Sequence, residues 1–279
     1  MHMDYHLLDL WRRYGDLLWE PGKHKEACRA YIDEMHRFMI INNHQEFDNE
    51  LLDALTIEFR RKGNRNSTIN RKFASLSKLL RKHHKNGFLV NLPDFQKLPE
   101  RNGRVRYLTR EEEANLLCEL EREDRKYAQL SRFLAETGAR IGEALKLNWA
   151  DIEPGYTTFW ETKSHRPRTI PLSRRAQGVV DEVRGQENAQ CGPFQDIPYP
   201  KFRDGWNVAK SRTTMRNDPQ VVPHVLRHTC ASRLAQSGVD IKRIQEFLGH
   251  RTLSMTLRYA HLSPRHLDVC ADALNNMTH

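Results

Sequence analysis

The chain has 279 residues, of which 38% are hydrophobic and 29% are charged, so it is long enough for one large domain or two ordinary ones and a wholly disordered chain is excluded. Lys and Arg outnumber Asp and Glu by 45 to 36, which gives a net charge of +9 at pH 7. An excess of this size favours a polyanionic partner, with nucleic acid ahead of an anionic membrane. No apolar run approaches the roughly 20 residues of a membrane-spanning helix, so we expect no membrane segment.

The N-terminus and the cysteines predict a cytoplasmic location, in the bacterial or host cytosol or the nucleoid. The first residues do not combine a cationic start with an apolar stretch, so we expect no secretory signal. The five cysteines form no Cys-x-x-Cys pair, which is typical of reduced thiols. His24 and Cys28 share a helix face, but no second ligand pair accompanies them. We therefore predict no metal site.

Helical periodicity dominates residues 1–100. Apolar residues at helical spacing predict helices over 7–19, 27–38 and 51–57, with a break at Pro21-Gly22. A fourth helix is expected to begin with Asn66-Ser67 as its N-cap. Its apolar residues fall within a narrow arc and are Ile69, Phe73, Leu76, Leu79 and Leu80.

The stretch from Phe59 to Lys85 contains many basic residues and no acidic one. A solvated helix face normally mixes both signs, so we interpret this stretch as a surface that follows DNA phosphates. Lys72 belongs to the same run, and Asn70, Arg71, Ala74 and Lys78 are candidates for groove contacts. The predicted DNA-binding residues of the stretch are Arg60, Arg61, Lys62, Arg65, Arg71, Lys78, Arg81, Lys82 and Lys85.

Prolines, Gly103 and several arginines between residues 92 and 110 predict a linker, and we place the domain boundary near residue 105. The chain then consists of a helical DNA-binding domain (1–100), a basic linker (101–107) and a second domain (108–279). Arg104 and Arg106 of the linker are further predicted DNA contacts. Thr109 and Glu112 have the spacing of a capping box, which predicts the start of a helix.

The second half predicts helices around one β-hairpin. A core helix containing Tyr127 and Phe133 is expected to end at Thr137-Gly138, and the next is expected to run from Arg140 through Leu147. Short β-type runs at 156–160 and 168–172 flank a polar connection and predict the hairpin. Further helices are expected around Trp206, from Pro223, from Asp240 and after Thr252. The predicted fold class is mainly α with a small β-sheet (α+β).

Four motifs and a hairpin lysine follow one another in this half: Thr137-Gly138-Ala139-Arg140, Lys163, His224-Val225-Leu226-Arg227-His228-Thr229, Leu248-Gly249-His250, and Tyr259 nine residues later. Each has a modest explanation by itself, such as a glycine that ends a helix or a polar helix face. Together they resemble the tyrosine recombinase (phage integrase) family, whose pattern they match at every element over about residues 105–265. The helical first hundred residues look like the core-binding domain of that family.

The residue types suit attack on a DNA phosphodiester. The reaction puts extra negative charge on the non-bridging oxygens, and the guanidiniums of Arg140 and Arg227 can clamp these oxygens without losing their protons. The resemblance implies that Tyr259 forms a 3′-phosphotyrosyl bond and that Lys163 protonates the leaving 5′-oxygen. It also implies that His224 is the general acid/base assisting Tyr259 and that His250 donates a hydrogen bond to the phosphate.

The resemblance also predicts partners and cofactors. Because the covalent intermediate keeps the phosphoester, neither ATP nor a metal is expected, and we interpret the carboxylates Glu143 and Asp151 as structural. The expected partner is double-stranded DNA at recombination sites, held in a C-shaped clamp by a homotetramer, with possible accessory bending or directionality proteins. The tail from Pro264 to Leu274 is expected to dock on a neighbouring subunit.

Within the family, integration or excision of a phage or other mobile element is our first prediction, and a Xer-like resolver of DNA dimers is the alternative. A type IB topoisomerase and a non-catalytic DNA-binding regulator are the competing classes outside it. The chain starts almost directly with the first helix, so it is either a recombinase of simple sites or a piece from which an arm-binding domain was removed. His2-Met3 resembles a cloning remnant, which keeps the second possibility open.

Overall fold

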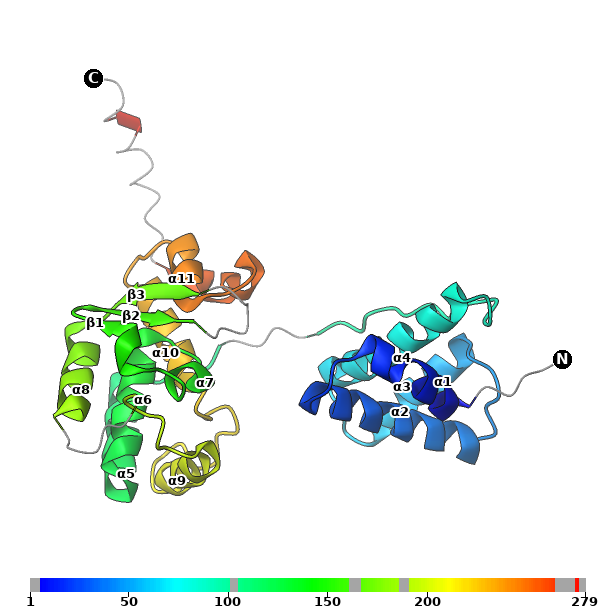
Figure 1. Ribbon diagram of the computed structural model, residues 1–279, viewed down its shortest axis with the longest axis horizontal. Coiled ribbons are helices and arrows are strands. Elements are labelled where there is room, and N and C mark those ends of the chain that lie inside the picture. Colours follow the sequence, from blue (N-terminus) through cyan, green and yellow to red (C-terminus); the bar gives the residue numbers. More distant parts are fainter. Residues whose placement is uncertain (1–5, 101–104, 161–166, 186–190, 264–273, 276–279) are drawn as a thin grey trace. The chain divides into compact units, whose positions relative to one another are not determined.

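The computed structural model describes residues 6–100, 105–160, 167–185, 191–263 and 274–275 (Figure 1). The chain divides into two compact units, residues 1–102 and 103–279. Each unit has a hydrophobic core of its own. The units are helical apart from one three-stranded sheet in the second, so the predicted fold class is confirmed.

The first unit is built from four helices. α4 packs against α1 and α2, and α2 also contacts α3. Asp48 begins the third helix, because its side chain accepts a hydrogen bond from the Leu51 backbone N–H at 2.8 Å. The helices are α1 (Leu7–Leu18), α2 (Lys23–Ile41), α3 (Asn49–Arg61) and α4 (Asn66–Lys85).

The apolar arc predicted for α4 is confirmed, since Ile69, Phe73, Leu76, Leu79 and Leu80 are all buried. The predicted N-cap is wrong by one to two residues. Arg65 has extended backbone angles and occupies the N-cap position, with no capping hydrogen bond from its side chain. Asn66 already lies in the helix and donates its side-chain amide to the Pro99 carbonyl at 2.8 Å. The side-chain amide of Asn66, which was expected to cap the helix, thus binds the segment that follows α4 instead.

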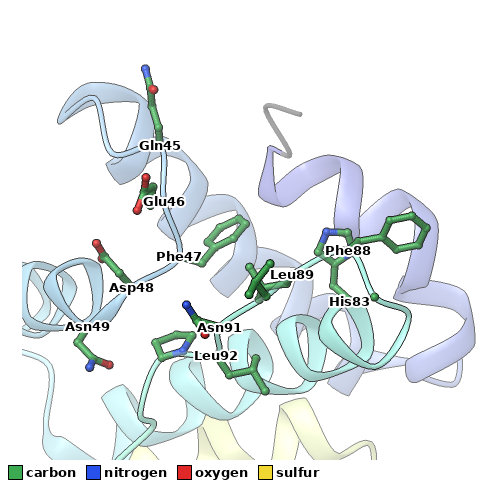
Figure 2. Close-up of a pocket in the computed structure, with 13 residues that line it drawn as sticks. Gln45, Glu46, Phe47, Asp48, Asn49, His83, Phe88, Leu89, Asn91 and Leu92 are labelled. Atoms are coloured by element: carbon green, nitrogen blue, oxygen red, sulfur yellow. The ribbon is translucent and has the colours of Figure 1, made fainter. Parts of the chain in front are cut away.

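A hollow of about 680 Å³ lies between the loop that joins α2 to α3 and the segment after α4 (Figure 2). Residues 45–49 line one side, and His83 with residues 87–93 lines the other. Phe47, Leu89 and Leu92 supply apolar surface that packs on the core of the unit. None of the predicted catalytic residues lines this hollow.

The second unit places helices around the small sheet. α6 contacts α5, α8, α9 and α10, so it is the central helix of this unit. The sheet is antiparallel with the order β1-β2-β3, and Thr157 pairs with Ile170. The elements are α5 (Arg110–Glu123), α6 (Arg125–Thr137), α7 (Ile141–Ala144), η1 (Trp149–Asp151), β1 (Ile152–Glu153), β2 (Tyr156–Phe159), β3 (Arg168–Pro171), α8 (Arg174–Arg184), α9 (Tyr199–Ser211), α10 (Val225–Gln236), α11 (Ile241–Leu248), η2 (Leu253–Met255) and η3 (Leu257–Leu262).

Several predictions for this unit are confirmed. Thr109 and Glu112 form the capping box of α5, with hydrogen bonds of 2.9 and 3.1 Å. β2 and β3 form the hairpin. No helix among the residues described here is long and apolar enough to cross a membrane.

Other expectations for this unit are corrected. The helix expected from Arg140 through Leu147 ends at Ala144, and Pro223 lies ahead of α10 rather than in its first turn. The segment after Thr252 forms two 3₁₀ helices, η2 and η3, instead of an α-helix. β1 and α8 were not expected, although the spacing of Ala176, Val179, Val180 and Val183 behind the N-cap Ser173 is a helix signal.

Candidate active site

Arg140 is fixed at the junction between α6 and α7. α6 ends at Gly138, which has a left-handed φ of 59° and turns the chain toward α7. Arg140 is the N-cap residue of α7, and its backbone N–H donates to Glu143 Oε2 at 2.9 Å. Its Nη1 donates to Glu143 Oε1 at 2.7 Å, so one carboxylate holds both the backbone and the side chain of this arginine.

A second arginine, Arg168 on β3, binds the same carboxylate. Its Nη2 donates to Glu143 Oε2 at 2.8 Å, and its guanidinium lies over the Phe159 ring with 4.6 Å between CZ and the ring centroid. Burial raises the pKa of Glu143, but the hydrogen bonds and charges of Arg168 and Arg140 outweigh burial and hold this pKa below its usual value. Glu143 is therefore ionised at neutral pH and holds two arginines of the site.

The C-terminal end of α11 accepts hydrogen bonds from three arginines. Arg168 Nε donates to the Phe247 carbonyl at 3.2 Å, and Arg227 Nη2 donates to the Leu248 carbonyl at 2.8 Å. Arg140 Nη2 lies 3.4 Å from the Gly249 carbonyl. The last carbonyls of a helix have no partner within it and carry the negative end of its dipole, so cations are favoured there. This arrangement gives the Leu-Gly-His motif a physical role, because its backbone orients guanidiniums.

Gly249 itself is required by two features of this helix end. Its φ is 67°, a left-handed value that glycine adopts without steric cost. A Cβ atom at this position would lie 2.9 Å from Arg168 Cδ and 3.1 Å from Arg168 Nη1. The glycine thus both ends α11 and leaves room for the Arg168 side chain.

Arg227, on α10, is more buried than Arg140, with 3% of its surface exposed. Besides the Leu248 carbonyl it binds the Gly138 carbonyl at 2.5 Å. Burial and the nearby charges of Arg140 and Arg168 lower the pKa of Arg227 to about 9, so it remains protonated at neutral pH. Arg140 and Arg227, which the sequence predicted to act together, are thus held by neighbouring carbonyls of one helix end.

Two predicted histidines, His224 and His250, are neutral at pH 7. His224 is the exposed N-cap residue of α10, and loss of hydration together with the charges of Arg227 and Arg140 lowers its pKa. His250 follows Gly249, and its Nδ1 lies 2.9 Å from Thr256 Oγ1. Burial and the same two arginines lower the pKa of His250 to about 3. A neutral imidazole retains one N–H donor and one acceptor, which suits the predicted hydrogen bonding to a phosphate.

The predicted nucleophile, Tyr259, lies in η3 with 1% of its surface exposed. Burial raises the pKa of its phenol. Its hydroxyl lies 2.6 Å from Nδ1 of His228, one turn after His224 on α10. Burial and neighbouring charges lower the pKa of His228 to about 4, so this imidazole is neutral where it shares a hydrogen bond with the phenol.

The histidine hydrogen-bonded to Tyr259 is therefore His228, whereas the sequence assigned the assisting role to His224. The rings of these two histidines are 4.8 Å apart in an edge-to-face arrangement, so His224 lies beside the contact. The i, i+4 spacing of the two histidines was visible in the sequence, but it does not say which of them faces the tyrosine. Arg168 was not singled out either, although its place at the start of the second hairpin strand was a weak signal.

Some of the predicted DNA-binding residues of the first unit form ion pairs with carboxylates, and others do not. Lys62 pairs with Glu34 at 3.2 Å and with Glu58, and Arg61 pairs with Glu58 at 2.8 Å. The basic run is thus partly neutralised by Glu58, just before it in sequence, and by Glu34 of α2. Among the residues described, no ion pair involves Arg60, Arg65, Arg71, Arg81, Lys82 or Lys85, all of which are exposed or half-buried.

Three further polar residues of this run serve the unit itself. Lys72 is buried and pairs with Glu34 at 2.6 Å, and Lys78 donates to the Leu18 carbonyl. Asn70 binds both the backbone N–H and the carbonyl of Leu98 at 2.9 Å. Asn70 and Lys78 thus make internal contacts that hold α1 and the segment after α4, and the groove contacts expected of them remain predictions.

The guanidinium of Arg106, which was predicted to contact DNA from the linker, binds two carboxylates. It binds Glu112 at 2.6 and 2.8 Å and Asp218 at 2.9 Å, and these contacts raise its pKa. Arg106 thus anchors the start of the second unit, and its contact with DNA remains a prediction. Lys163, Arg104 and the tail residues 264–273 lie outside the described residues.

The structure gives no support for a metal centre in the described part of the chain. No group of three or more His, Cys, Asp or Glu side chains there is placed to hold an ion. His24 lies 3.8 Å from Cys28 Sγ through Nε2, and this pair stands without further ligands in that part of the chain. The charged groups of the site are guanidiniums with one carboxylate, a composition that binds an anion.

Comparison with known proteins decides the family. Residues 106–266 match the model of the phage integrase family, which is more than half of the chain. The integrase of Escherichia phage P2 is 30% identical over 267 residues, covering 92% of this chain and 75% of that protein. The chain belongs to the phage integrase family. The resemblance found in the sequence motifs is thereby confirmed, and the protein is a tyrosine recombinase, an enzyme that cleaves and rejoins DNA.

Other phage integrases match different shares of the chain. The integrase of Haemophilus phage HP1 is 36% identical over 137 residues, which is 49% of this chain and 37% of that protein. A crystal structure of a lambda integrase tetramer bound to a Holliday junction superposes with a TM-score of 0.76 at 19% identity, covering 95% of this chain and 80% of that one. Bacterial tyrosine recombinases, some named XerC, also match this member of the phage integrase family.

Proposed function

We propose that the protein is a site-specific recombinase of a phage or other mobile element and that it acts through a covalent bond between Tyr259 and DNA. The observation that carries this proposal is the convergence of Arg140, Arg227 and Arg168 on one helix end beside neutral histidines and a buried tyrosine. Three guanidiniums against one carboxylate leave net positive charge where a phosphate must bind.

The chemistry follows from these groups. The Tyr259 oxygen forms a bond to phosphorus while the bond from phosphorus to the 5′-oxygen breaks, and the phosphoester energy is kept in the new bond. The phenol loses its proton and the 5′-oxygen gains one, for which we propose Lys163 as the donor. Arg140 and Arg227 stabilise the charge that develops on the non-bridging oxygens, and His250 adds a neutral hydrogen bond. His224 is proposed to assist proton transfer.

The position of Tyr259 in this structure implies that the residue must move before it attacks. Tyr259 is buried and bonded to His228, so its hydroxyl does not reach a phosphate in this conformation. Attack requires that the η3 segment shift and that this hydrogen bond break. We propose that binding of double-stranded DNA supplies the free energy for that shift.

Partners and organisation are proposed on the same basis. Residues 1–100 act as a DNA-binding domain through exposed cations such as Arg71 and Lys85, residues 101–107 act as a linker, and residues 108–279 carry out catalysis. The relatives named above include a lambda integrase tetramer bound to a Holliday junction, which supports a homotetramer here. Exchange of the tail between subunits is a further part of the proposal. Accessory bending or directionality proteins and a location in the cytosol or nucleoid belong to the same proposal.

A nicked suicide substrate tests the enzymatic part. The short fragment released after cleavage diffuses away, so the 3′-phosphotyrosyl adduct accumulates and migrates as a larger species on a denaturing gel. We expect the adduct with wild-type protein and none with Tyr259→Phe. Because the cognate site is unknown, captured genomic fragments serve as substrate, and sequencing them separates a mobile-element attachment site from a dimer-resolution site. Absence of any adduct across the library contradicts the proposal.

A further inference from the structure

Glu143 presents an electrostatic problem for the site. It is buried, ionised and bonded through Oε1 to Arg140 Nη1 at 2.7 Å. If Arg140 were its only cationic partner, the two would form a closed ion pair, and that arginine would offer little net charge to a phosphate. Because binding of a phosphate requires net positive charge beside Arg140, another cation must balance the charge of the Glu143 carboxylate.

Arg168 provides that balance. Its Nη2 binds Glu143 Oε2 at 2.8 Å, on the oxygen that does not receive the Arg140 side chain. Arg140, Arg168, Arg227 and Glu143 together carry three positive charges and one negative charge. Removing Arg168 would halve the net charge of the cluster from +2 to +1, even though Arg140 and Arg227 stayed in place.

The burial of Arg168 separates its role from that of a phosphate ligand. Only 8% of its side chain is exposed, against 21% for Arg140. Nε is bound to the Phe247 carbonyl, and Nη1 is buried without a hydrogen-bond partner among the described residues. Leaving a charged donor unpaired in the interior is costly, so a purely structural tie between β3 and α11 would be better served by an uncharged or fully paired side chain.

We propose that Arg168 is a positioning residue that offsets the Glu143 carboxylate and so keeps Arg140 cationic toward the scissile phosphate. This inference rests on the proposed function, since it concerns the phosphate in that reaction. Arg168 does not touch the DNA. It acts through Glu143, whose backbone and side-chain contacts hold Arg140 at the start of α7.

The experiment measures single-turnover adduct formation on two suicide substrates of the captured sequence. One carries the natural phosphodiester, and the other carries a methylphosphonate at the scissile position, where a methyl group replaces a charged oxygen. On the natural substrate, Arg168→Gln is expected to slow cleavage by about 10- to 100-fold, which is the effect of one unit of charge at a partly screened site. On the uncharged substrate the deficit should shrink to about threefold or less.

The double variant Glu143→Gln/Arg168→Gln provides the second readout, because removing both charges restores the net +2. We expect it to cleave the natural substrate about tenfold faster than Arg168→Gln alone. Arg168→Lys, which keeps the charge, should retain more activity than Arg168→Gln. Arg125→Gln is the matched control, since this exposed arginine pairs with Glu182 on the surface and should leave both rates within about twofold.

Two outcomes overturn the inference. A deficit of equal size on both substrates, or a double variant no faster than the single one, would show that Arg168 only ties β3 to α11. Thermal melting of each variant identifies loss of folding, and in that case the charge-preserving Arg168→Lys is compared on the two substrates instead. If the wild-type protein forms no adduct on either substrate, the proposed function has failed. The two outcomes that overturn the role of Arg168 differ from this result, because in both of them the wild-type protein forms the adduct.

Discussion

Replacing Gly249 by alanine tests the packing at the end of α11. Alanine in the left-handed region costs about 1–2 kcal/mol relative to its ordinary conformations. The new Cβ would also lie 2.9 Å from Arg168 Cδ, and hydrogen bonds to Phe247 and Glu143 prevent that side chain from swinging away. Such overpacking typically costs about 1–3 kcal/mol more. The expected loss of unfolding free energy is thus about 2–5 kcal/mol.

Gly238→Ala is the matched control for this substitution. Gly238 has a φ of 77°, and a Cβ there would meet nothing within 4 Å, so only the backbone cost applies. In a unit of this size each kcal/mol lowers the melting temperature by roughly 2–4 °C. Calorimetry should show Gly249→Ala melting several degrees below Gly238→Ala, and single-turnover cleavage should fall only in the former. Equal melting temperatures and rates would refute the role assigned to Gly249.

Three further outcomes follow from the geometry. The pKa values of His228 and His250, about 4 and about 3, lie below the ordinary 6.5, so the unfolded chain binds more protons in acid than the folded one. The melting temperature should therefore fall as the pH drops from about 6.5 to 4, and His250→Asn should reduce this dependence. An unchanged dependence in the variant contradicts the assignment. Tyr259→Phe should abolish the adduct yet lower the unfolding free energy by only about 1 kcal/mol in urea titrations, because one hydrogen bond is lost; a loss several times larger would show that the hydroxyl organises the fold. Arg71→Ala should weaken DNA binding and reduce the slope of log affinity against log salt by about 1. The ammonium of Lys62 is paired with Glu34, so Lys62→Ala should leave the slope unchanged. Identical slopes for the two variants would contradict the assigned surface.

The sequence predicted the parts of the site that lie in local motifs. Thr137-Gly138 and Leu248-Gly249 are read correctly as helix ends, since a left-handed glycine cap is set by neighbouring residues. The amphipathic arc of α4 is likewise a local property. The family, the mainly helical fold and the hairpin could all be obtained at this level.

The sequence did not predict contacts that depend on distant elements. Arg168 meets Glu143 from 25 residues away and Phe247 from 79 residues away, and no periodicity links them. Lys72 was counted in the basic run without a partner, but the position of α2 brings Glu34 against it. The 3₁₀ form of η3 was missed because apolar spacings of three and four residues are hard to separate over six residues.

The use of backbone carbonyls at the end of α11 has an evolutionary consequence. Carbonyl acceptors are independent of residue type, so substitutions at 247 and 248 that preserve the packing of the buried Leu248 leave the backbone acceptors of the arginines in place. The glycine at 249 is constrained in residue type by its φ and by the adjacent side chain. The exposed positions of α11 can therefore vary in sequence without changing the backbone groups that orient the three arginines.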